Sequence, residues 1–154
     1  MQRTQDFKIR YAQEKDFPYI FQMVNKVVSH LFPEDLPTEE RIRDLFDKGL
    51  ENTNFTCIVL VDPEDIPKGY VFACVHELYF HTKTLGVCLS IWVEEDCRAH
   101  SMDMLRAFDK WGKYKGVNTL VLSEFENLTP KGSSKVLSWF GFELKEKQYW
   151  KDLQ

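Results

Sequence analysis

Residues 85–103 read LGVCLSIWVEEDCRAHSMD, and this stretch decides the expected fold because an apolar run passes within a few residues into the start of a helix. The first part, 85–93, favours a largely buried strand. Beyond an acidic turn, apolar residues recur on one helical face at Leu105, Phe108 and Trp111. Gly116 then stands where a left-handed helix cap belongs. We therefore expect a strand over 85–93 followed by a helix over 101–115.

The same patterns extend outward over the whole chain. Alternating or continuous apolar runs predict strands over 7–11, 55–61, 70–80, 85–93, 118–123, 141–144 and 148–153. Helical spacing predicts helices over 16–31, 38–50, 101–115 and 129–140. Asp16 and Thr38 are the expected N-caps of the first two helices. The order is β-α-α-β-β-β-α-β-α-β-β, an α/β fold with a mixed β-sheet.

Length and composition indicate one domain over 1–154, since a chain of 154 residues can bury a sizeable core. The hydrophobic content of 44% and the charged content of 29% are ordinary for a globular protein. A net charge of −4 argues against a broad nucleic-acid-binding surface. There is no apolar run of membrane-spanning length and no signal-peptide pattern, so we expect no membrane partner and a cytoplasmic location.

The cysteines are spaced too widely for the paired C-x-x-C motif of zinc and redox sites, at Cys57, Cys74, Cys88 and Cys97. We predict reduced, mostly buried thiols that form no disulfide and bind no metal. The sequence also contains no phosphate-binding loop and no Ser/His/Asp order that would indicate another class of enzyme.

Residues 93–103, VEEDCRAHSMD, resemble the acetyl-coenzyme A motif V-x-P-x-x-R-G-x-G-x-G/A of the GCN5-related N-acetyltransferases (GNAT). Val93 and Arg98 match at the right spacing, and WFGF over 139–142 is similar to the family's K-L-G-F turn. The resemblance covers nearly the whole chain in element order. It implies a GNAT-like mixed sheet with helices on both faces, and a monomer or homodimer.

The motif also departs from the family. Its proline falls on Glu95, and its three glycines fall on Ala99, Ser101 and Asp103. Those glycines let backbone N–H groups approach a diphosphate at a helix N-terminus, where the helix dipole favours an anion. Alanine and serine are compatible with this, whereas the Asp103 carboxylate would repel the anion. A tyrosine that donates a proton in many family members is replaced by Leu137.

By resemblance, the cofactor is acetyl-CoA or another short acyl-CoA. The residues expected to bind it are Trp92, Val93, Arg98, Ala99, His100, Ser101, Met102 and Asp103. Among Glu94, Glu95 and Glu124, each of which can also be read as a solvated loop charge, Glu94 is our choice for the catalytic base. Tyr149 is the expected second catalytic residue, with an edge or core aromatic as the alternative reading.

Two functions follow from these residues. The first is an enzyme that moves an acetyl or short acyl group from coenzyme A to an amine, on a small molecule or a protein, by direct attack. The second is a non-catalytic interaction protein that keeps the fold and has lost its cofactor, and a viral protein would also fit this description. The departures at Asp103 and Leu137 are compatible with this second function. Binding of acetyl-CoA distinguishes the two hypotheses.

Overall fold

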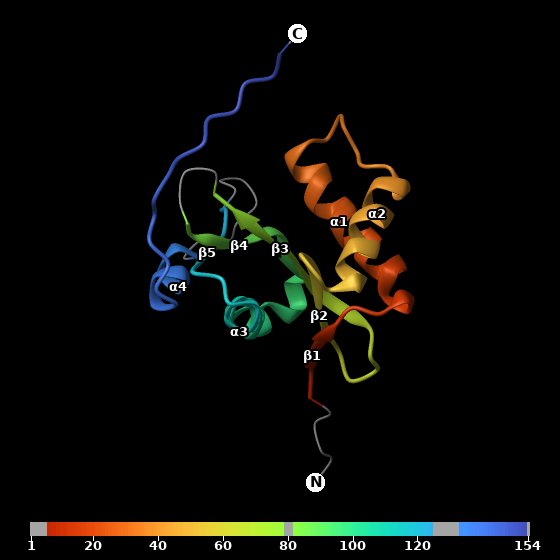
Figure 1. Cartoon of the computed structure of the whole chain (residues 1–154). Coiled ribbons are helices and arrows are strands. Elements are labelled where there is room, and N and C mark those ends of the chain that lie inside the picture. Colours follow the sequence, from red (N-terminus) through yellow and green to blue (C-terminus); the bar gives the residue numbers. More distant parts are fainter. Residues whose placement is uncertain (1–5, 79–81, 125–132, 154) are drawn as a thin grey trace.

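The computed structural model describes residues 6–78, 82–124 and 133–153. Within them, a five-stranded mixed sheet in the order β1-β2-β3-β4-β5 forms the centre of the molecule (Figure 1). The strands are β1 (Lys8–Tyr11), β2 (Phe55–Val61), β3 (Pro67–Glu77), β4 (Thr84–Val93) and β5 (Thr119–Val121). The first four strands pair antiparallel with their neighbours, and β5 pairs parallel to β4.

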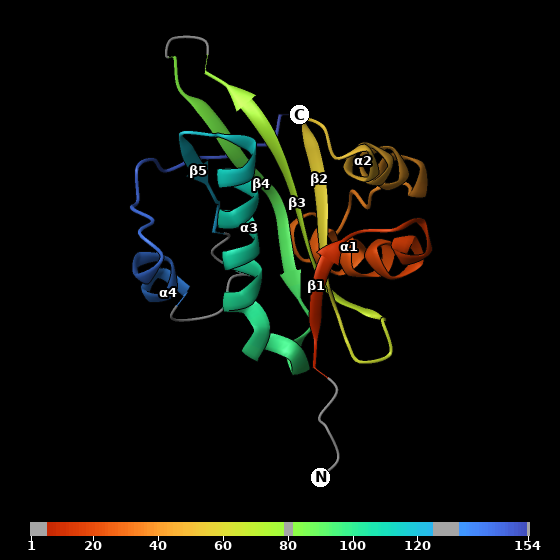
Figure 2. The same cartoon turned by 60° about the horizontal axis from the view of Figure 1, so that its bottom comes forward.

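Helices cover both faces of this sheet, as Figure 2 shows. The helices α1 (Phe17–Leu31) and α2 (Glu39–Glu51) lie on one face, after the short 3-10 helix η1 (Glu14–Asp16). The 3-10 helix η2 (Glu95–His100) and α3 (Ser101–Lys115) lie on the other. The helix α4 (Ser133–Trp139) lies beyond β5. None of the helices in the described part of the chain is long and apolar enough to span a membrane.

Two apolar cores hold these layers together, one on each face of the sheet. Alternate side chains of β2 and β3 face α1 and α2, where the most buried members include Ile20, Phe46, Val59 and Tyr70. The intervening side chains face α3, where they include Leu60, Val71, Met104 and Phe108. Because β2 and β3 are covered on both faces, their sequences are continuously apolar, as expected for central strands.

An irregularity in β4 shapes the edge of the sheet. The register with β3 passes from Phe72 opposite Ser90 to Ala73 opposite Cys88, so Leu89 has no partner across the ladder and forms a β-bulge. On its other side, β4 pairs with β5 only over 85–87. Residues 88–93 therefore have no strand partner on that side among the described residues, and we call them the open edge of β4.

Most predicted elements are confirmed, including the strand over 85–93 and the helix over 101–115. Thr38 caps α2 by accepting a hydrogen bond from the Arg41 N–H at 3.3 Å, and Gly116 ends α3 with φ of +72°. Residues 79–80 of the strand predicted over 70–80, and 129–132 of the helix predicted over 129–140, lie outside the described residues.

The two strands predicted over 141–144 and 148–153 are wrong, because residues 142–153 form neither strand nor helix. Their pairing partner would be β5, which has only three residues. The connection Lys145-Glu146-Lys147 also lacks the glycine, asparagine or proline that a tight hairpin turn favours. The aromatic and apolar side chains that alternate with polar ones in this segment therefore have no sheet face on which to pack.

Candidate functional site

The candidate site lies where the open edge of β4 runs into η2 and α3. Its backbone can be reached because β5 ends its pairing at Val87, six residues before β4 ends at Val93. The helix α3 begins eight residues after Val93, and its first turn therefore lies at the same end of the sheet. Unpaired strand backbone offers N–H and C=O groups to an extended ligand, and a helix N-terminus favours an anion.

Glu94 is held at the end of β4 by an ion pair with α1. Both carboxylate oxygens of Glu94 lie 2.9 Å from the Lys26 ammonium, and the Glu94 N–H donates to the Lys68 carbonyl at 2.8 Å. The Glu94 side chain is 22% exposed, so water can reach it. The candidate base is therefore fixed in place on the α1 side of β4, with Lys26 as its counterion.

Trp92 and Arg98 contact each other at the same place. The Arg98 guanidinium lies 4.7 Å from the centre of the Trp92 ring, and its Nε donates a hydrogen bond to the Val93 carbonyl. The Trp92 indole nitrogen is buried and has no hydrogen-bond partner among the described residues. Arg98 thus folds back against the end of β4. Because its Nε is already bonded to Val93, only its two terminal nitrogens remain to bind an anion.

The first turn of α3 is partly engaged by the chain itself. The N–H of Ser101 donates to the Arg98 carbonyl, so one of the amides that we expected to face a diphosphate already has a partner. Ala99 is exposed, and Ser101 and Met102 are half-buried. The positions of the family's first two glycines thus carry the small side chains of Ala99 and Ser101.

His100 and Asp103 face away from the open edge of β4. The His100 ring stacks on Phe7, just before β1, with ring centres 4.2 Å apart. The Asp103 carboxylate lies 3.4 Å from His100 Nδ1 and 3.0 Å from Arg106 Nη1. These partners offset the negative charge of Asp103, so its repulsion of an anion at the helix end is weaker than the sequence suggested.

The remaining predicted residues are not brought to this site. Tyr149 is 91% exposed in the C-terminal segment, which has no regular structure. Glu124 is exposed three residues beyond β5, and Leu137 is half-buried in α4. The structure therefore groups Glu94, Trp92 and Arg98, whereas it leaves Tyr149 almost fully exposed to solvent.

Sequence reasoning missed two features of the site. Lys26 is 68 residues from Glu94 in the chain, so no local pattern could connect them. The Tyr70 hydroxyl lies 2.9 Å from the Ser90 hydroxyl inside the sheet, and burial raises the pKa of Tyr70 above its ordinary value. The only available signal was that polar Ser90 interrupts an otherwise apolar strand.

Solved structures show which class of protein shares this arrangement. An acetyltransferase from Trypanosoma brucei is 16% identical, covering 96% of this chain and 100% of that chain, with a TM-score of 0.72. A GNAT family acetyltransferase from Staphylococcus aureus is 13% identical, covering 96% and 98%, with a TM-score of 0.67. The enzyme AAC(6')-Iy, bound to the bisubstrate analogue CoA-S-monomethyl-acetylneamine, is 16% identical, covering 97% and 99%, with a TM-score of 0.70.

These likenesses extend over the whole chain and show that it has the fold of the GNAT acetyltransferases. No protein-family model matches the sequence, and no curated protein matches it significantly. The fold is thus shared at sequence identities of only 13–16%. Activity and substrate must be argued from the site.

Proposed function

We propose that this protein is an N-acetyltransferase that uses acetyl-CoA or another short acyl-CoA and transfers the acyl group to an amine. The observation that carries the proposal is the open edge of β4, created by the bulge at Leu89 and the early end of β5 pairing. It lies directly before the N-terminus of α3. An extended donor with amide groups and a diphosphate suits an unpaired strand edge that leads to a helix N-terminus.

The residues of the chain take separate roles in this proposal. The backbone of residues 88–93 binds the extended part of the donor, and the start of α3 with Arg98 binds its diphosphate. When bound, an acyl-CoA supplies an activated thioester carbonyl. By the resemblance, the backbone N–H of Val93 polarises that carbonyl. Glu94 takes the proton that the attacking amine loses, directly or through water, as the N–C bond forms and the C–S bond breaks.

The acceptor is an amine that approaches from the α1 side of β4, where Glu94 and Lys26 lie. Solved neighbours of the same fold include an aminoglycoside acetyltransferase bound to sisomicin. For this chain, we propose an amine on a small molecule or a protein, and a cytoplasmic place of action. Because Lys26 occupies both oxygens of Glu94, an ammonium acceptor can exchange with Lys26 as it binds.

A second function is favoured by one specific observation. Arg98 Nε bonds to the Val93 carbonyl and the Ser101 N–H bonds to the Arg98 carbonyl, so two donors expected near the cofactor already have partners within the chain. This arrangement would suit a protein that keeps the fold as an interaction module and no longer binds coenzyme A.

Calorimetric titration with acetyl-CoA tests the proposal and separates the two functions. We expect the parent protein to bind acetyl-CoA in the titration. In thermal unfolding, acetyl-CoA at a hundred times its dissociation constant should stabilise the folded protein by about 2.7 kcal/mol. Ala99→Glu should abolish binding, because it adds a carboxylate beside the proposed diphosphate position. Ala99→Ser changes the same residue without adding a charge, so this variant should bind acetyl-CoA like the parent. An absence of binding by a folded parent at millimolar acetyl-CoA would favour the interaction module.

A further inference from the structure

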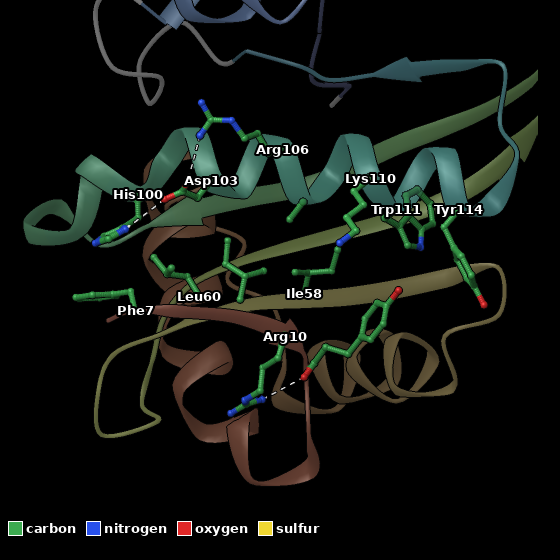
Figure 3. Close-up of a pocket in the computed structure, with 13 residues that line it drawn as sticks. Phe7, Arg10, Ile58, Leu60, His100, Asp103, Arg106, Lys110, Trp111 and Tyr114 are labelled. Atoms are coloured by element: carbon green, nitrogen blue, oxygen red, sulfur yellow. Dashed lines mark hydrogen bonds and ion pairs between the residues drawn. The ribbon is translucent and has the colours of Figure 1, made fainter. Parts of the chain in front are cut away.

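A groove lies between β1 and α3, on the side of α3 opposite the open edge of β4 (Figure 3). It has a volume of about 720 Å³, which is within the range of small-molecule sites. Its floor is formed by apolar side chains of β1 and β2, namely Ile9, Ile58 and Leu60. The groove is therefore separate from the proposed acyl-transfer site.

One face of α3 forms the wall of the groove. Ala107, Lys110 and Tyr114 recur there at helical spacing, and Tyr11 of β1 stands across from them. The stacked pair of Phe7 and His100 closes the other end. The groove thus has an aromatic and apolar interior along about three turns of helix.

Among the charged side chains that line the groove, Lys110 differs from the arginines because it forms no ion pair with the described residues. Arg10 is bonded to Asp16 and Asp65, and Arg106 is bonded to Asp103. Lys110 has no ion-pair partner among the described residues, and Figure 3 shows its ammonium on the groove side of α3. The groove therefore favours a ligand with one negative charge over a polyanion such as a diphosphate.

A buried donor without a partner lies next to Lys110. The Trp111 indole nitrogen has no hydrogen-bond partner in the described part of the protein, although the residue is only 2% exposed. In Figure 3 this nitrogen lies on the ring edge that faces away from α3, toward the strands. A buried N–H group without a hydrogen-bond partner is costly. A ligand with an acceptor that reaches this N–H group would therefore bind more tightly.

From these observations we propose that the groove binds a small amphipathic monocarboxylate, with its apolar body along Ile9 and Leu60. Its carboxylate lies between the Lys110 ammonium and the Trp111 indole N–H, since both residues line the groove. The aliphatic and aromatic floor holds the body, and the two donors hold the anionic end. This site requires no coenzyme A, so it stands apart from the proposed acetyl transfer.

The test is titration of the full-length, ¹⁵N-labelled protein with octanoate, followed by the indole N–H resonances of its tryptophans. We expect saturable binding in which the Trp111 indole resonance, assigned from Trp111→Phe, moves downfield because it gains a hydrogen bond. Lys110→Gln should weaken octanoate binding about tenfold, since a charge-assisted contact is lost. Ala107→Phe should abolish binding by filling the groove.

Matched controls make the result decisive. Lys113→Gln removes a lysine of the same helix that is paired with Asp109 outside the groove, so octanoate binding should be unchanged. Octylamine has the same chain with the opposite charge and should bind at least tenfold more weakly. Equal binding of octylamine, unaltered binding by Lys110→Gln, or no saturable binding of octanoate would overturn the proposal. Binding of acetyl-CoA is measured separately and does not affect this outcome.

Discussion

Asp16 shows how a single residue connects several elements of this fold. Its side chain is 1% exposed and accepts hydrogen bonds from Arg10 at 2.7 and 3.0 Å and from the Gln13 N–H at 2.8 Å. The sequence suggested a cap for the following helix, but the side chain makes no such bond to α1. Its role is instead to join β1 to η1, and the Asp16 carboxylate raises the pKa of Arg10 by hydrogen bonding.

Removal of Arg10 should therefore destabilise the protein strongly. Arg10→Ala leaves the Asp16 carboxylate buried without its counterion, so we expect the free energy of unfolding to fall by about 3 kcal/mol. Urea denaturation measures this directly. Arg43→Ala serves as the comparison, because Arg43 makes surface ion pairs with Glu14 and Asp47, and a clearly smaller loss is expected. Equal losses in the two variants would contradict the structural role of Asp16.

Asp65 provides a prediction about pH. Hydrogen bonds from Lys15 and Arg10 lower the pKa of this exposed carboxyl below its ordinary value. The folded state therefore holds the proton more weakly than the unfolded state, and the stabilisation is present above the unfolded pKa and lost as pH falls through the folded pKa. Asp65→Asn should melt below the parent at pH 7, and this gap should narrow as the pH falls below the unfolded pKa and through the folded pKa. A gap that is constant with pH would argue against the ion pairs.

The thiols should differ in reactivity according to their burial. All four cysteines are free, and burial raises the pKa of Cys88 to about 12 and raises the pKa of Cys57 as well. Because the thiolate is the nucleophile, both should be inert to iodoacetamide at pH 8 in the folded protein. Cys74 is half-buried and should label first, and all four should label in urea. Mass spectrometry of the labelled peptides identifies the sites, and early labelling of Cys57 would show that the core opens.

At the scale of elements, the contact between α3 and β5 depends on two glycines. A Cβ placed on Gly112 would lie 2.5 Å from Leu120 Cδ2, and one on Gly86 would lie 2.9 Å from the same atom. Leu120 of β5 is therefore enclosed between α3 and β4 and has little room to move. This packing holds the short strand β5 beside the first part of β4, and so positions the end of their pairing.

Gly112→Ala should for this reason destabilise the protein, although alanine favours a helix over glycine by about 1 kcal/mol. We expect a net loss of roughly 1–2 kcal/mol from the overpacked contact, measured by urea denaturation. In a double-mutant cycle, the variant that carries both Gly112→Ala and Leu120→Ala should lose less free energy of unfolding than the two single variants lose together. Additive losses would indicate that Leu120 does not restrict position 112.

At the scale of the molecule, the sequence was informative where local patterns decide the structure. The helix over 101–115 was predicted with its bounds, because its apolar face and Gly116 are local signals. Sequence patterns did not predict three other features, namely the bulge at Leu89, the ion pair of Lys26 with Glu94 and the inward turn of Arg98. Each of them depends on backbone pairing or on contacts between segments that are distant in sequence. The motif therefore indicated the fold correctly, whereas the contacts around its residues could be found only in the structure.

The C-terminal segment is the clearest case in which pattern and packing disagree. Its alternation predicted two strands, yet Leu144, Tyr149 and Leu153 are 80%, 91% and 86% exposed. Local periodicity and the resemblance at WFGF supported the prediction, but a strand also needs a neighbouring edge and a covered face to be stable. The ring of Trp150 stacks on Phe32 at the end of α1, with centres 5.5 Å apart. This contact ties the segment to the helical layer.

Deletion of residues 143–154 tests this arrangement. Exposed side chains contribute little burial, and one aromatic stack is worth about 0.5–1.5 kcal/mol, so the free energy of unfolding should fall by only about 1 kcal/mol. Phe32→Leu in the full-length chain removes the stack alone and should account for most of that loss. If the segment instead completed the sheet in solution, each large side chain would bury surface worth about 1.5–3 kcal/mol. Deletion would then cost several kcal/mol in urea denaturation, and Phe32→Leu would reproduce little of it.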